Sequence, residues 1–134
     1  MSETQAPPKS FKIFHWTAVV FLFLIMAQPT FDNVRALATG TLGSGDMSVE
    51  VTLSQMALHV VAMLVGWVGF FWFFRRQKRG AYASVVAHIL GFTAVFTQTP
   101  ELLDMMPPAA LVVFFVLLFV FALGPVFKFK EQYT

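Results

Sequence analysis

Long apolar stretches alternate with short polar or proline-containing joints along this chain. Four of the stretches are almost free of charged side chains. Each approaches the roughly 20 residues that an α-helix needs to cross about 30 Å of hydrocarbon. We therefore predict an all-α, polytopic membrane protein with four transmembrane helices. The predicted spans cover about residues 13–28, 53–74, 81–98 and 109–127.

The composition supports the same class. Of the 134 residues, 57% are hydrophobic and only 12% are charged, whereas about a quarter of the residues in an ordinary soluble domain are charged. Four spans use nearly the whole chain, so we expect a single membrane domain over residues 1–134. The absence of cysteine excludes disulfides, thiolate metal sites and cysteine catalysis.

The positive charges are distributed unevenly. Eight of the nine lysines and arginines lie before the first span, between the second and third, or after the fourth. Four crossings bring those three places to one side. Because cytoplasmic loops carry the excess of lysine and arginine, we expect both termini to be cytoplasmic. The turn between the second and third spans then acts as a topology anchor through Arg75, Arg76, Lys78 and Arg79.

The segment between the first two spans is the longest polar one. Residues 31–38 place apolar side chains at helical spacing before Gly40, which predicts a short interfacial helix in the exoplasmic loop, ended by glycine. Residues 43–46 are interpreted as a flexible joint. Ser48 and Glu50 suit the start of the second membrane helix.

Small and polar residues recur on one face of the second span and on one face of the third, at alternating steps of four and three. Small residues let helix backbones approach closely in lipid. We expect the two spans to pack face to face as an antiparallel pair. The expected packing residues are Gly66, Gly69, Ser84 and Gly91.

Three histidines are the ionisable residues within the predicted spans, and such positions are hypotheses of function. One hypothesis is a b-type haem held by two imidazoles. Counted from the basic turn, His59 lies about 22 Å and His88 about 10 Å into the membrane. This difference argues against pairing them, so His15 and His88 are the better-matched haem ligands. The alternative is that the histidines hydrogen-bond neighbouring helices.

A second group of polar side chains should gather toward the exoplasmic surface. A small polar molecule or the head group of a quinone would hydrogen-bond there, or the same groups would satisfy backbone near the prolines. The span cores contain no carboxylate, which argues against a proton-coupled exporter. The candidate ligand-binding residues are Gln28, Gln55, His59 and Gln98.

The seven methionines favour gap-filling and lipid-facing roles, because their spacing brings no pair to one surface with a histidine, and we expect no metal site. We predict a non-enzymatic accessory or structural subunit of a larger assembly in the bacterial inner membrane. The alternatives are a dimeric protein that binds or transports a small ligand, and an electron-transfer subunit linked to haem or quinone. The expected partners are lipid and other membrane subunits, or a second copy, and not nucleic acid. No cofactor is expected under the leading hypothesis.

Overall fold

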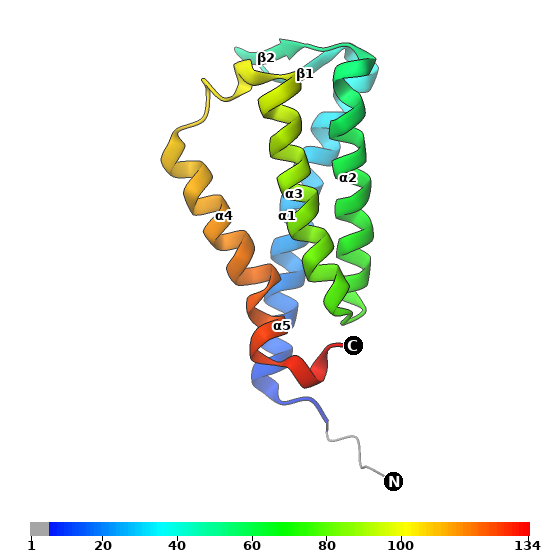
Figure 1. Ribbon diagram of the computed structural model, residues 1–134, viewed down its shortest axis with the longest axis vertical. Helices are drawn as coiled ribbons and strands as arrows, with labels where there is room; N and C mark the ends of the chain where they lie inside the picture. The colour runs from blue at the N-terminus through cyan, green and yellow to red at the C-terminus, as the bar shows by residue number, and fades with distance from the viewer. Residues whose placement is uncertain (1–5) are drawn as a thin grey trace.

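Four long apolar helices dominate the chain, as the sequence predicts, and they identify an integral membrane protein. The structure is a computed structural model that describes residues 6–134. The four helices run alternately up and down (Figure 1). They are α1 (Lys9–Thr39), α2 (Leu53–Phe74), α3 (Lys78–Gln98) and α4 (Pro108–Ala122), the last continued by the short helix α5 (Gly124–Lys128).

The two ends of the bundle differ in the segments they carry. The start of α1, the last described residues and the turn between α2 and α3 lie at one end, which we call the terminal end (Figure 1). The opposite end, the hairpin end, carries strands β1 (Thr41–Ser44) and β2 (Met47–Glu50) and the 3₁₀ turn η1 (Pro100–Leu102). The basic segments predicted to share one side therefore lie at the same end of the bundle.

Helix α1 continues through Pro29 and ends at Gly40, which adopts the left-handed conformation. The prediction of a separate interfacial helix over residues 31–38 is therefore wrong, although those residues are helical. Proline removes one backbone donor, and at the next residue the Thr30 hydroxyl donates to the Met26 carbonyl at 2.6 Å, which adds a side-chain hydrogen bond to this turn of the helix. With 31 residues, α1 is about 46 Å long and extends beyond the hydrocarbon core.

The polar segment after α1 folds into an antiparallel hairpin, in which Thr41 pairs with Glu50. Of residues 43–46, expected to be a flexible joint, the first two belong to β1 and the last two form the turn. Ser48 and Glu50 lie in β2, so the expectation that they begin the second membrane helix is wrong. Thr52 caps α2 instead: its hydroxyl accepts a hydrogen bond from the backbone N–H of Gln55, and the Gln55 side chain accepts one from the backbone N–H of Thr52.

Helices α2 and α3 form the most extensive pair in the bundle, as predicted. A Cβ atom at Gly69 would lie 2.8 Å from the backbone nitrogen of Ser84, so the two backbones are in close contact there. Gly80 similarly lies against the backbone of Phe73. The connection between the helices is short, since α2 ends at Phe74 and α3 begins at Lys78.

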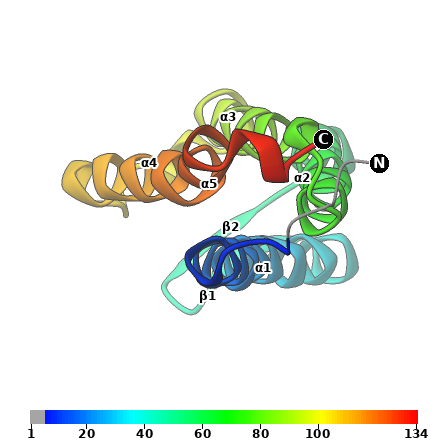
Figure 2. The ribbon, with the colours of Figure 1, turned by 90° about the horizontal axis from the view of Figure 1, so that it is seen from below.

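Helix α4 packs against the bundle mainly through its second half. Leu118 and Ala122 are fully buried, and the Phe21 and Phe121 rings stack at 4.5 Å between α1 and α4. Toward its first residues, α4 tilts away from α3 (Figure 1). Viewed from the terminal end, α1 lies on one side of the bundle, and α2, α3 and α4 lie on the other (Figure 2). Many apolar side chains of α4, including Val116, are exposed, so much of the surface of this helix is available to lipid.

An aromatic cluster closes the terminal end. It consists of Phe11, His15, Phe73 and Tyr133, whose rings lie 5.3 to 5.7 Å apart in adjacent pairs. Backbone hydrogen bonds join Thr134 to the α2–α3 turn: its N–H donates to the Arg76 carbonyl, and its carbonyl accepts from the Lys78 N–H. The last described residues therefore tie the start of α1 to the turn between α2 and α3.

We expect the hairpin end to be exoplasmic and the terminal end to be cytoplasmic, because the basic residues gather at the latter. The chain has no native cysteine, so the labelling of a single introduced cysteine shows on which side of the membrane that residue lies. In whole cells, a membrane-impermeant maleimide should label Asp46→Cys at the hairpin tip but not Glu131→Cys after α5. Both positions are exposed. Labelling of Glu131→Cys alone would mean that the chain inserts with the opposite orientation.

Candidate ligand-binding site

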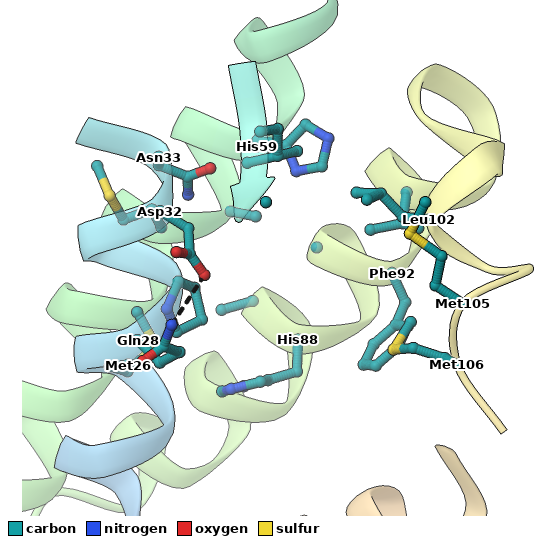
Figure 3. Close-up of a pocket in the computed structure, with 18 residues that line it drawn as sticks. Met26, Gln28, Asp32, Asn33, His59, His88, Phe92, Leu102, Met105 and Met106 are labelled. Carbon is teal, nitrogen blue, oxygen red and sulfur yellow. Dashed lines mark hydrogen bonds between the residues drawn. The ribbon is translucent and has the colours of Figure 1, made fainter. Parts of the chain in front are cut away.

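A cavity of about 490 Å³ lies between α1 and α3 in the half of the bundle toward the hairpin end. Helix α2 forms one wall, and β1 and the loop before α4 contribute Leu42, Leu102 and Met105. We call this space the α1–α3 cavity. No residue of α4 lines it. Its lining is mainly apolar, with five polar side chains from three helices: Gln28, Asp32, Asn33, His59 and His88 (Figure 3).

Three of those polar groups come from successive turns of α1. The amide nitrogen of Gln28 donates to a carboxylate oxygen of Asp32 at 3.1 Å, as the dashed line in Figure 3 shows. This bond occupies one donor of the amide and leaves the Gln28 carbonyl oxygen as an acceptor. Asn33 is only 5% exposed. The continuation of α1 beyond Pro29 is what brings Asp32 and Asn33 to the cavity.

His59 enters the cavity from α2. It is 7% exposed, and its Nε2 lies 3.4 Å from the Thr99 hydroxyl. Thr99 is fully buried at the end of α3, immediately before η1. This contact ties His59 to the segment that connects α3 with α4. In Figure 3, His59 occupies the part of the cavity nearer the hairpin end, and His88 lies farther from it.

His88 enters from α3 and has a defined tautomer. Its Nδ1 lies 2.7 Å from the Ser84 carbonyl, and because a carbonyl only accepts, Nδ1 carries the hydrogen. In the neutral ring Nε2 then holds a lone pair. This atom is buried and has no hydrogen-bond partner within the described residues 6–134. The ring packs against Phe114 of α4 and is 9% exposed.

The candidate ligand-binding residues divide between two locations. Gln28 and His59 line the cavity, whereas Gln55 and Gln98 do not. The Gln55 side chain instead caps α2 and donates from its Nε2 to the Gln98 carbonyl at 3.2 Å, which joins α2 to the end of α3. These two glutamines therefore act in helix capping and helix packing. This matches the alternative in which the polar side chains hydrogen-bond backbone groups and do not bind a ligand.

His15 and His88, the hypothetical haem ligands, are in different surroundings. His15 belongs to the aromatic cluster, where its Nδ1 lies 2.8 Å from the Tyr133 hydroxyl. Burial raises the pKa of Tyr133, and the positive charge of Arg76 partly opposes this shift. The phenol is therefore protonated at neutral pH and forms a hydrogen bond with the imidazole. His15 does not line the α1–α3 cavity, and we do not propose that these two histidines share a haem.

The four expected packing residues are all at or near the α2–α3 interface. Gly69 and Ser84 are in direct backbone contact. A Cβ at Gly66 would meet the flexible end of Met26 on α1 and, at 3.4 Å, the Cβ of Ala87 on α3. At Gly91 a Cβ would have only ordinary contact, 3.9 Å from the Cβ of Ala62, and the position borders the cavity.

The basic residues of the α2–α3 turn also contact aromatic rings. The Arg79 guanidinium lies 4.2 Å from the Trp72 ring centroid, and that of Arg76 lies 5.1 Å from the Phe11 ring centroid. Such contacts are favourable by roughly 0.5 to 1 kcal/mol at exposed sites. They add a packing role to the topology role that the sequence predicts.

Several of the residues that line the cavity, chiefly methionines, were not predicted from the sequence. Met63 is on α2, while Met26 is on α1 and Met105 and Met106 are in the loop before α4, and all four line the cavity with the two histidines. The sequence-based expectation concerned closely spaced pairs of methionines, whereas these four come from separate segments of the chain. Spacing along one helix does not reveal a surface assembled from three separate segments.

Comparison with known proteins finds no relative: no protein-family model, no curated protein and no solved structure matches this chain. Function therefore has to be argued from the cavity and from the residues that line it.

Proposed function

We propose that this protein binds a lipophilic small molecule in the α1–α3 cavity, as a non-enzymatic binding protein of the bacterial inner membrane. The cavity itself is the main support. Its volume of about 490 Å³ is within the range of roughly 300 to 1,000 Å³ typical of small-molecule sites. An apolar lining with a few polar groups is also typical of such sites. The basic residues at the terminal end favour a cytoplasmic position for that end.

The tilt of α4 favours entry of the ligand from the bilayer. Helix α4 contacts α1 through Phe121, near its end, while the first part of α4 diverges from α3 (Figure 1). No residue of α4 closes the cavity, which begins at the level of Met26. This arrangement supports lateral entry of an apolar molecule from the membrane on the side of α4.

Purification in a mild detergent, followed by native mass spectrometry and solvent extraction, tests the proposal. We expect the wild-type protein to retain one defined apolar molecule per chain. Gly91→Leu should lose it, because the added side chain projects into the cavity without meeting backbone. Val116→Leu, on the exposed face of α4, is the matched control and should retain it.

Bulk lipid alone in the wild type, or equal retention in Gly91→Leu, would contradict the proposal. The same purification tests the accessory-subunit hypothesis that the sequence suggests. Stoichiometric partner proteins, together with an empty cavity, would favour that role over ligand binding. A Soret absorption band would favour the haem-linked electron-transfer alternative.

A further inference from the structure

Several polar atoms of the α1–α3 cavity are hydrogen-bond acceptors. The Asp32 carboxylate and the Gln28 carbonyl oxygen accept, and one N–H of the Gln28 amide already donates to Asp32. The Nε2 of His88 is the most informative of these atoms, because its tautomer is set by the bond from Nδ1 to the Ser84 carbonyl. A ligand that complements this lining has to bring donors.

We propose that the ligand of the α1–α3 cavity carries a hydroxyl group that donates to the Nε2 of His88. The inference rests on the proposed function and specifies the ligand as a lipophilic phenol, quinol or alcohol. Nε2 is buried and has no partner within residues 6–134, and a buried acceptor without a partner is unfavourable. In Figure 3 the His88 ring extends from α3 toward Gln28 and Met26 of α1.

A similar contact already exists within the chain. At the terminal end, the Tyr133 phenol lies 2.8 Å from the Nδ1 of His15, and both residues are buried. That pair shows that a phenol and an imidazole suit each other in the apolar interior of this bundle. The proposed contact repeats the chemistry at a second histidine, with the phenol or alcohol supplied by the ligand.

A quinol has a particular advantage over a single phenol. Its two hydroxyls are on opposite sides of a ring, so that when one donates to His88 the other remains available to a second polar group of the lining, which includes Asp32 and Asn33. Phe92 lines the cavity and offers a flat surface to the ring. The oxidised quinone has only acceptors and would leave His88 without a donor, so the site should prefer the reduced form.

Paired probes of matched shape test the inference. We expect the wild-type protein to bind para-nonylphenol about tenfold more tightly than para-nonylanisole, the methyl ether that lacks the donor, since one hydrogen bond typically accounts for a factor of this order. His88→Phe keeps an aromatic ring against Phe114 but has no Nε2, so it should bind the two probes equally. Gly91→Leu should bind neither probe in the cavity. Any probe that remains with this variant therefore measures partition into the detergent micelle.

Each outcome is informative. Equal binding of phenol and ether by the wild type would overturn the hydroxyl inference but leave the proposed function in place. Binding of neither probe would overturn both. A preference for the phenol that survives in His88→Phe would show that another group accepts the hydrogen bond, and would overturn the assignment to His88.

A spectroscopic measurement avoids dependence on the folding of the variant. With ¹⁵N-labelled histidine, the Nε2 signal of His88 in the wild-type protein should shift when nonylphenol is added and should stay in place with nonylanisole. Absence of a shift with the phenol would overturn the proposal. Decanol, an aliphatic alcohol, identifies the source of the hydroxyl: a response to nonylphenol alone indicates a phenol or quinol, and a response to both indicates any lipophilic alcohol.

Discussion

Gly69→Ala is expected to lower the free energy of unfolding by about 1 to 3 kcal/mol, the usual effect of overpacking a tight contact. The added methyl would lie 2.8 Å from the backbone nitrogen of Ser84 and 3.0 Å from the carbonyl carbon of Ala83. Backbone cannot move aside as the end of a flexible side chain does, so α2 and α3 would have to separate. Thermal unfolding in detergent, followed by circular dichroism, measures the loss.

Gly91→Ala is the matched control for this prediction. It makes the same substitution on the partner helix, but its methyl would meet only the Cβ of Ala62, at 3.9 Å. We expect unchanged or slightly increased stability, because alanine is the better helix former. Equal losses in Gly69→Ala and Gly91→Ala would show that close backbone contact is not what holds the two helices together.

Tyr133→Ala is expected to destabilise the bundle by about 3 to 5 kcal/mol, which is typical when a large buried ring is removed. The Tyr133 side chain is 3% exposed, packs against the rings of Phe11 and Phe73, and hydrogen-bonds His15. Its loss opens the aromatic cluster and leaves the Nδ1 of His15 without that partner. Chemical or thermal unfolding in detergent provides the measurement.

Two further variants separate packing from hydrogen bonding at this position. Tyr133→Phe keeps the ring and removes only the hydroxyl, so we expect a loss of about 1 kcal/mol. Tyr82→Ala removes a tyrosine that is 49% exposed and should have little effect. If Tyr133→Ala behaves like Tyr82→Ala, the aromatic cluster does not stabilise the terminal end.

The spans and the main helix pair are encoded locally, and this is why the sequence predicts them. The run of residues 53–74 is mainly apolar and long enough to cross a membrane, so the sequence alone predicts a span there. The structure places α2 at Leu53–Phe74. The small residues Gly69 and Ser84 recur at helical spacing on their own helices, so the face that each helix presents is also readable. The short α2–α3 connection then leaves antiparallel pairing as the simplest arrangement.

The remaining features depend on contacts between segments far apart in the sequence. Pro29 normally signals the end of a helix, and the bonds that support α1 beyond it include one from the Trp67 indole to the Thr30 hydroxyl at 2.8 Å. A β-hairpin forms where the sequence predicted a flexible joint and the start of a helix. Its two strands satisfy each other's backbone hydrogen-bonding groups. The cavity draws its lining from α1, α2, α3 and two loops, so only its histidines and Gln28 had a signal in the sequence.

The aromatic cluster also has a consequence for the order of folding. His15 and Tyr133 are 118 residues apart in the chain, whereas α2 and α3 are joined by a turn of a few residues and can pair as soon as both are in the membrane. Contacts of long sequence separation form slowly because the intervening chain has to be ordered first. The α2–α3 pair should therefore assemble early, while the rings of Phe11 and Phe73 stay uncovered until the segment after α5 arrives. During that interval the terminal end is the part of the protein most open to quality-control proteases and to mispairing with other membrane helices.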